Sequence, residues 1–326
     1  MEDYFDQPLV DLGLGEPAFA GIFTPAPEVG AARQGITDQF LADGAEYHRK
    51  YSNAPYFRGL FEKAFAACGR PAGERLTILD IGTGPGVNTI QPCLELFPAC
   101  RIIATDLSPP LLGILRSYVT AAGLEDHVAC VCTDAMRNYF KPAAFDLVVG
   151  TAILHHLMDP AEALRSARRA LKPGGMAIFV EPFEGFVLLR VMFETILARA
   201  EREGLALDPK VSGVMAAFNL DFRYRMGRDK SDPAFQVMDD KWLFTRAYLD
   251  EARKAAGFSS FDLVSAHDCD NQLFRRLVLE MVEMGAGVLA QDIPAWAWEE
   301  IDRFDRCLSR DLKEDLAFEG VIVLRA

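Results

Sequence analysis

A short apolar run that leads into three alternating glycines constrains the fold of this chain more than any other feature. Residues 78–81 read Ile-Leu-Asp-Ile, and Gly82, Gly84 and Gly86 follow at every second position. Glycine reaches positive φ and has no Cβ, so such a loop turns tightly and lets a ligand approach bare backbone amides. The stretch predicts a buried strand, a ligand-binding turn and the start of a helix, an arrangement that suits a nucleotide-like ligand.

The glycine spacing is G-x-G-x-G, which differs from the dinucleotide-binding fingerprint. That fingerprint places its third glycine where this chain has Val87. Asp80 stands just inside the end of the first strand, and Asp106 ends the next apolar run, residues 101–106. A carboxylate at the end of that second strand can accept both hydroxyls of a ribose. These residues favour a nucleoside-containing cofactor other than NAD.

Four further motifs follow the glycine loop in order. They are Thr-Asp-Ala at 133–135, Phe-Asp-Leu-Val-Val at 145–149, Leu-His-His-Leu at 154–157 and Leu-Lys-Pro-Gly-Gly at 171–175. With them, residues 76–182 resemble the class I S-adenosylmethionine-dependent methyltransferases, whose first motif has the form (I/L)-L-D-(I/V)-G-x-G-x-G. Five motifs in the right order are far more specific than one glycine loop.

The resemblance implies a fold and a cofactor site. The implied fold is α/β, a Rossmann-like doubly wound sheet of seven strands with the seventh antiparallel, carrying a helical cap or lid. The implied cofactor is S-adenosyl-L-methionine. Its expected binding residues are Asp80, Gly82, Gly84, Gly86, Asp106, Leu107, Asp134, Ala135, Thr151 and Tyr51.

The chain is longer than this minimal pattern and is expected to divide into four parts. Residues 1–72 would form an N-terminal arm and helical cap, and residues 73–182 the cofactor-binding core. Residues 183–257 would form a helical lid insertion, and residues 258–326 would add strands six and seven around a second helical insertion, 268–317. Both insertions leave from carboxyl ends of parallel strands, where open α/β sheets bind ligands, so we expect them to cover the substrate.

The N-terminal part has two segments of different character. Residues 1–35 are rich in proline and glycine, which is typical of an irregular arm on a surface or of a disordered segment. Residues 47–57 are dense in aromatic side chains. Tyr47, Tyr51 and Tyr56 are candidates to close over the methionine or substrate end of the site, and packing between cap and sheet is the alternative.

Histidine and glutamate side chains near strand ends are candidates for a catalytic base. Methyl transfer from a sulfonium is one in-line displacement, which needs an aligned acceptor in a dry pocket. An acceptor with a high pKa must also lose a proton, and histidine removes protons best near neutral pH. His156 and His155 follow strand four, Glu181 ends strand five and His267 ends strand six. The alternatives are packing against the cofactor for the histidine pair and a capped strand end for Glu181.

The chain offers less information about the acceptor. Residues 183–226 are rich in aromatic and methionine side chains, which predicts a lid core and, from the remainder, an apolar pocket for an aromatic, polyketide-like, quinone or prenylated molecule. Arg223, Arg225, Arg228 and Lys230 form a local basic cluster. It would either hold a carboxylate or phosphate of the substrate or form a solvated basic face.

Composition limits the partners and the location. The chain has 47 acidic and 34 basic side chains and a net charge of -13, which disfavours binding to nucleic acid. Its seven cysteines include no C-x-x-C pair, which favours a reducing compartment, and its five histidines lack metal-binding spacing. No signal-peptide pattern or bilayer-spanning run appears. We expect a cytoplasmic protein with a small-molecule substrate, no metal, no nucleic-acid partner and no membrane insertion; a homodimer is left open.

These observations predict a methyltransferase that uses S-adenosylmethionine to modify a small apolar or aromatic metabolite, of the kind found in secondary metabolism. Two alternatives remain open from the sequence. An NAD-dependent dehydrogenase is disfavoured by Val87 and by the later motifs. A catalytically inactive binding protein with a methyltransferase fold is disfavoured by the intact glycine loop together with Asp80, Asp106 and Asp134.

Overall fold

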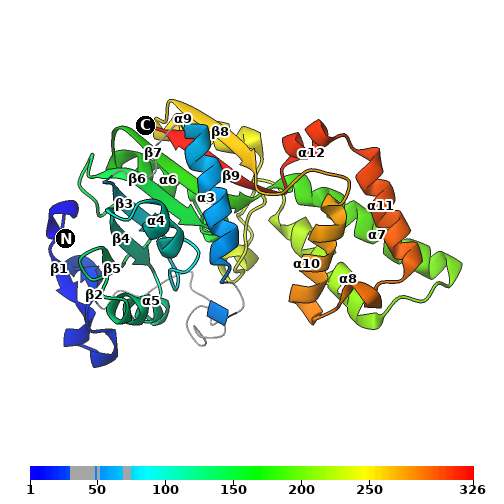
Figure 1. The fold of residues 1–326 in the computed structure, drawn as a ribbon, viewed down its shortest axis with the longest axis horizontal. Coiled ribbons are helices and arrows are strands. Elements are labelled where there is room, and N and C mark those ends of the chain that lie inside the picture. The colour runs from blue at the N-terminus through cyan, green and yellow to red at the C-terminus, as the bar shows by residue number, and fades with distance from the viewer. Residues whose placement is uncertain (30–47, 50–51, 69–74) are drawn as a thin grey trace.

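The structure is a computed structural model that describes residues 1–29, 48–49, 52–68 and 75–326. Figure 1 shows two parts side by side, a sheet covered by helices that contains both termini and a separate group of helices. Among the described residues, no helix has the length and the apolar character needed to cross a membrane.

One sheet of nine strands runs through the larger part. The strands are β1 (Leu9–Asp11), β2 (Ile22–Pro25), β3 (Thr77–Ile81), β4 (Arg101–Asp106), β5 (Val128–Cys132), β6 (Phe145–Thr151), β7 (Leu171–Pro182), β8 (Ser260–Ser265) and β9 (Glu319–Arg325). Their order is β1-β2-β5-β4-β3-β6-β7-β9-β8. Strands β3 to β7 pair in parallel, and β9 is antiparallel to both of its neighbours, β7 and β8. The strands from β5 to β8 in this order confirm the predicted doubly wound sheet with an antiparallel seventh strand.

The N-terminal segment corrects the expected strand count, because it adds two strands to the seven. It is neither an irregular arm nor disordered over its first 29 residues: β1 and β2 form an antiparallel pair, and β2 extends the sheet in parallel to β5. The Thr24 hydroxyl donates to the carbonyl of Cys132 at 3.0 Å, and Ile22 is 1% exposed. The Asp11 carboxylate accepts the amide protons of Gly13 and Gly21, which closes the loop between the two strands.

Helices cover both faces of the sheet. On one face lie α3 (Ala54–Cys68), α4 (Ile90–Leu96) and α5 (Pro109–Ala121), and on the other lie α6 (Pro160–Ala170) and α9 (Arg246–Ala256). Successive residues of β3 point to opposite faces, so Ile78 packs with the first group and Leu79 with the second. A strand that is buried on both faces has a continuous run of apolar residues. For this reason residues 78–81 could be predicted as a strand from the sequence.

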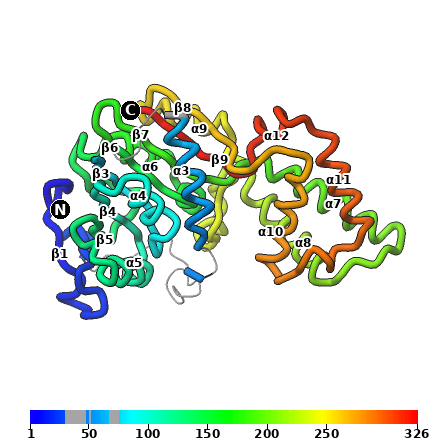
Figure 2. Tube along the Cα trace, in the orientation of Figure 1, coloured from blue at the N-terminus to red at the C-terminus, as the bar shows by residue number. Residues whose placement is uncertain are grey.

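The remaining helices form a unit with a hydrophobic core of its own. They are α7 (Val187–Glu203), α8 (Pro209–Arg225), α10 (Leu273–Ala286), α11 (Ala295–Cys307) and α12 (Arg310–Leu316). The first two come from the insertion after β7 and the other three from the insertion after β8, and the two sets pack together. Figure 2 shows that this unit joins the sheet part beside β9. The α9 helix, although within residues 183–257, packs against α6 on the sheet.

The joint between the two parts is closely packed around Gly185. The amide of Phe183 donates to the carbonyl of Phe318 at 2.8 Å, and the amide of Glu184 donates to Phe244 at 2.9 Å. These bonds hold the backbone after β7 against the segment before β9 and against the segment before α9. A Cβ on Gly185 would overlap with the carbonyl oxygen of Ala317, which is a backbone atom that cannot rotate away.

Replacing Gly185 with alanine should therefore destabilise the protein. We expect the free energy of unfolding of Gly185→Ala to fall by about 1–3 kcal/mol, the usual cost of forcing extra volume into a packed site. Urea denaturation followed by circular dichroism measures the change. Gly213→Ala is the matched control, because Gly213 is an exposed position in α8 with open space around its Cβ direction, and alanine there should be neutral or stabilising. Equal midpoints for both variants would contradict the packing argument.

Candidate functional site

A pocket of about 680 Å³ lies at the carboxyl ends of the central parallel strands. Gly82 and Gly84 follow β3, Asp106 ends β4, Asp134 follows β5 and Thr151 ends β6, and all five line it. This is the edge at which open α/β sheets bind their ligands. The volume lies within the range of small-molecule and cofactor sites.

The glycine loop adopts the backbone that its sequence predicts. Gly82, Gly84 and Gly86 all have positive φ, at 68°, 53° and 82°. A Cβ on Gly82 would lie 2.5 Å from Cγ1 of Ile153, so this glycine is needed for the loop to pack against the turn after β6. Gly86 does not line the pocket, and a Cβ there would overlap with Leu115 of α5.

Asp106 is fixed by the loop that it faces. Its Oδ2 accepts the amide proton of Gly84 and its Oδ1 accepts that of Ser108, both at 2.8 Å. Burial raises the pKa of this carboxyl, and the two amide bonds oppose the rise. A carboxylate held in this way on the pocket wall has lone pairs left for the hydroxyls of a ribose.

Asp80 lies behind the pocket. It is fully buried, and burial raises its pKa to about 8. Neither oxygen of its carboxyl, nor the hydroxyl of the pocket-lining Thr83, has a hydrogen-bond partner within 3.5 Å among the described residues. Buried polar groups in native proteins are normally satisfied, and of these groups only the Thr83 hydroxyl lines the pocket, where a bound polar ligand would complete it.

The structure brings together seven of the ten predicted cofactor residues. Those that line the pocket are Gly82, Gly84, Asp106, Leu107, Asp134, Ala135 and Thr151. Asp80 and Gly86 support the loop from behind. Tyr51, like Tyr47, lies outside the described residues.

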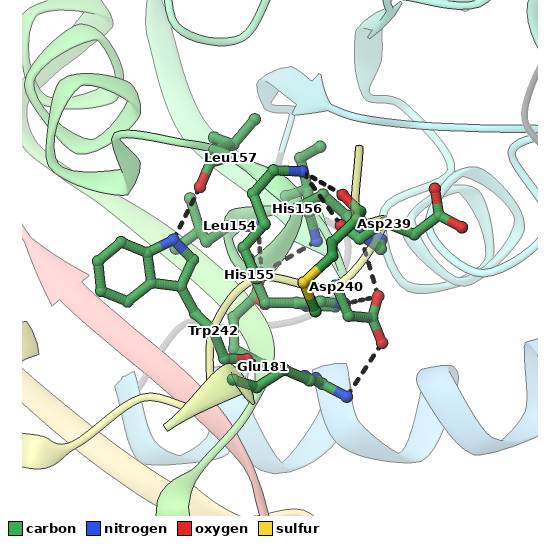
Figure 3. Close-up of polar contacts among 12 residues, drawn as sticks. Leu154, His155, His156, Leu157, Glu181, Asp239, Asp240 and Trp242 are labelled. Carbon is green, nitrogen blue, oxygen red and sulfur yellow. Dashed lines mark hydrogen bonds and ion pairs between the residues drawn. The ribbon is translucent and has the colours of Figure 1, made fainter. Parts of the chain in front are cut away.

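The turn after β6 is anchored by Glu181 (Figure 3). Glu181 is fully buried at the end of β7, and its Oε1 accepts the amide protons of Ile153 at 3.0 Å and Leu154 at 2.7 Å. Its Oε2 lies 2.7 Å from Nδ1 of His155 and accepts the amide proton of the same residue at 3.2 Å. Both oxygens of Glu181 accept hydrogen bonds, and the side chain does not line the pocket. Of the two roles considered for Glu181, the capped strand end therefore fits better than the catalytic base.

His155 also points away from the pocket. Its second ring nitrogen, Nε2, lies 3.3 Å from Oδ1 of Asp240. Burial alone would lower the pKa of His155, but the carboxylates of Asp240 and Glu181 outweigh burial and raise this pKa to about 9. The ring is therefore an imidazolium at neutral pH and has no lone pair with which to accept a proton.

His156 is the one predicted catalytic residue that lines the pocket. Its Nδ1 lies 3.0 Å from the carbonyl oxygen of Asp239 and 3.2 Å from Oδ1 of Asp240. These acceptors orient the ring at the pocket wall.

Asp240 is a neighbour of the site that the sequence did not identify, and Arg225, predicted only as part of a basic cluster, is its partner. Arg225 is 7% exposed, and its Nη1 lies 3.0 Å from Oδ2 of Asp240. The indole of Trp242 donates to the carbonyl of Leu157 at 2.8 Å, and the Lys241 amide donates to His155 at 2.8 Å. The segment before α9 is thus fastened to the turn after β6. No local signal marked it, because its partners lie more than 80 residues away.

His155, His156 and Asp240 stand close enough to hold a metal ion, with one ligand atom from each within 4.8 Å of the others. A metal requires neutral imidazole ligands. In the structure His155 lies between the carboxylates of Glu181 and Asp240, and Arg225 pairs with the other oxygen of Asp240. These contacts form an ion-pair network around the three residues.

The basic cluster predicted near the substrate is used within the protein. Arg225 pairs with Asp240, Arg228 pairs with Glu251, and Lys230 donates to the carbonyl of Arg225 at 3.0 Å. None of these side chains lines the pocket.

The aromatic and methionine side chains of residues 183–226 do not line the pocket either, which corrects the expectation that some of them would. Most pack in the core of the helical unit, as Met192, Phe193 and Met215 do. The insertions reach the pocket through Gln236, Lys241, Glu280 and Met284 instead.

Comparison with known proteins agrees with this geometry. Residues 79–179 match the family model described as a methyltransferase domain. Similar curated proteins include a demethylmenaquinone methyltransferase of Thermus thermophilus, 34% identical over 37% of this chain and 56% of that protein. A 27-O-demethylrifamycin SV methyltransferase of Amycolatopsis mediterranei is 35% identical over 32% of this chain and 37% of that protein. The chain thus spans roughly half the length of such relatives or less.

Among solved structures, phosphoethanolamine N-methyltransferase 2 of Haemonchus contortus, in complex with S-adenosyl-L-methionine, has a similar fold. The TM-score is 0.54 at 16% identity, over 93% of this chain and 62% of that chain. Sheet order, glycine loop and strand-end acids define a Rossmann-like methyltransferase domain. Residues 79–179 are therefore similar to the methyltransferase domains of S-adenosylmethionine-dependent methyltransferases.

Asp106 provides a direct test of the cofactor wall. Asp106→Ala should weaken binding of S-adenosylhomocysteine by about 1.5–3 kcal/mol, the usual value of hydrogen bonds to a charged group. Titration calorimetry on folded protein measures the loss. Asp126→Ala is the control, since Asp126 is exposed and does not line the pocket. If Asp106→Ala leaves the affinity unchanged, Asp106 does not bind the ribose of the cofactor.

The His155 ion pairs predict a dependence of stability on pH. The folded-state pKa of His155 is about 9 and the usual value is near 6.5, so its contribution is complete below pH 6.5 and is lost as the pH rises through 9. The size is up to about 3 kcal/mol, from about 1.4 kcal/mol per pKa unit.

The stability difference between the wild type and His155→Asn, measured by urea denaturation, should therefore shrink between pH 6.5 and 9.5. A difference that stays constant over this range would show that His155 is neutral in the folded protein.

Proposed function

We propose that this chain transfers the methyl group of S-adenosylmethionine to a small molecule bound in the same pocket. The observation that carries the proposal is the division of the pocket walls. One end is built from the glycine loop, Asp106 and Asp134, and the other from side chains of the insertions and of α3. A cofactor stretched along the first end would leave the second for an acceptor.

The cofactor supplies a methyl carbon made electrophilic by the sulfonium. The residues of this chain would align the acceptor and exclude water. Phe57, Leu111, Met158 and Met284 give the pocket apolar surfaces, which supports an acceptor with an apolar or aromatic body. The relatives that are named for methylating quinone precursors and a rifamycin support a small-molecule acceptor.

His156 is the proposed base. It would take the proton from the acceptor atom as that atom's lone pair forms the bond to the methyl carbon and the carbon–sulfur electron pair moves to sulfur. Asp239 and Asp240 would orient the ring through Nδ1. Histidine suits this task at neutral pH.

The helical unit is proposed to act as a lid. The observation that supports this role is the contribution of Glu280 and Met284 from α10 to the pocket. A cytoplasmic location and a place in secondary metabolism stay predictions, as does the homodimer left open by the sequence.

The proposal is tested by incubating the protein with S-adenosylmethionine labelled in its methyl group and a small-molecule cell extract. Label should appear in a small product, and S-adenosylhomocysteine, but not NADH, should stabilise the protein to heat. Stabilisation by NADH alone would favour a dehydrogenase. Tight binding of S-adenosylhomocysteine without transfer to any fraction would favour a binding protein.

Once an acceptor fraction is known, His156→Ala should lower turnover by about 10² to 10⁴ and leave the affinity for S-adenosylhomocysteine within a few fold. His127→Ala serves as the control, because His127 lies before β5, away from the pocket. Equal losses of rate and affinity would assign His156 to cofactor packing instead.

A further inference from the structure

Two carboxylates from different elements face the acceptor end of the pocket. Glu319 begins β9, and because β9 is antiparallel its first residue lies at the carboxyl edge of the sheet, opposite Pro182 of β7. Glu280 comes from α10. Both line the pocket, on the far side of β6 from Asp106 and Asp134.

The groups that lie beside Glu319 carry no positive charge to balance its carboxylate. The Tyr56 hydroxyl donates to Oε2 of Glu319 at 2.6 Å, and burial together with Glu319 keeps the phenol protonated by raising its pKa. Nε2 of His267 lies 3.6 Å from the same oxygen, but burial lowers the pKa of His267 to about 4, so the ring is neutral at pH 7. This Nε2 is buried and has no hydrogen-bond partner among the described residues.

The two carboxylates also act on each other. Burial, and then the charge of Glu280, raises the pKa of Glu319 to about 7, against the opposing bond from Tyr56. Burial raises the pKa of Glu280 as well. Raised pKa values in a pair of acids mean that their charge is under-compensated in the folded protein.

Two cations near the pair, among the described residues, are engaged elsewhere. Lys241 lines the pocket, but its Nζ donates to the carbonyls of Met238 at 2.6 Å and Asp239 at 3.4 Å. Arg276 of α10 pairs with Asp270 at 2.8 Å. A positive charge that binds between Glu280 and Glu319 would thus fill a need that the described residues leave unmet.

We propose that Glu280 and Glu319 bind a cationic nitrogen of the acceptor, so that the acceptor is an organic amine with an apolar body. The inference rests on the proposed methyl transfer and narrows its substrate class. Met158, Met284 and Phe57 supply the surface for the apolar body, and polarisable thioethers and an aromatic face also suit a neighbouring cation.

A pair of probes with almost the same shape tests this proposal. Phenethylamine carries the ammonium, and 2-phenylethanol replaces it with a hydroxyl. With S-adenosylhomocysteine saturating, calorimetry should find the amine bound at least about tenfold more tightly than the alcohol, as expected when a charge is paired. Glu280→Gln should remove most of that preference and leave the affinity for the alcohol unchanged.

Glu283→Gln is the matched control, because Glu283 is exposed on the same helix and does not line the pocket. It should keep the full preference for the amine. Glu319→Gln, which keeps the shape of glutamate, should reduce the affinity for the amine as Glu280→Gln does. Agreement between the two variants would show that the loss does not come from misfolding of one of them.

Three results would overturn the inference: equal affinities for amine and alcohol, no binding of the amine, or an amine affinity that Glu280→Gln leaves intact. If Glu280→Gln instead reduces the affinity for S-adenosylmethionine relative to S-adenosylhomocysteine and leaves the affinity for the amine unchanged, the carboxylates bind the sulfonium of the cofactor. Failure of S-adenosylhomocysteine itself to bind would contradict the proposed function, whereas its binding without amine preference would contradict the inference alone.

Discussion

The buried carboxylate of Glu181 is the contact on which the rest of the site depends. A charge away from water is stable only when hydrogen bonds and an opposite charge surround it. Three successive amides and the His155 ring meet this requirement. In doing so they fix the turn after β6, where Ala152 has a φ of 54°, a conformation that non-glycine residues rarely adopt.

From that turn, contacts extend in two directions. Ile153 packs over Gly82, so the turn shapes the cofactor loop. His155 binds Asp240, and through it the turn holds the segment that precedes α9. The turn after β6 therefore joins the cofactor loop, through Ile153, to a charge network that continues from Asp240 to Arg225 and Asp221.

Local patterns were sufficient for the first two core strands because each is an apolar run that ends at a glycine loop or an acidic residue. The runs 78–81 and 101–106 agree with β3 and β4. Strands β1 and β2 could not be predicted in this way. They have three and four residues, lie among prolines and glycines, and exist because they pair with each other and with β5.

The same limit applies to the site. His155 and His156 are adjacent residues of the same type and both contact Asp240, but only the His155 ring also binds Glu181, while His156 faces the pocket. The residue that distinguishes them lies 26 positions away along the chain. The position of Glu319 could have been predicted from the sequence, because the first residue of an antiparallel seventh strand lies at the ligand-binding edge of the sheet.

The position of β9 has a consequence for how the chain assembles. It lies between β7 and β8, and it follows every helix of the helical unit along the chain. The sheet part and the helical unit are both built from segments that are interleaved in sequence. During synthesis the sheet cannot be completed until residues 319–325 have left the ribosome, whereas every helix of the helical unit has been synthesised by residue 316, so the sheet part is the last to be completed.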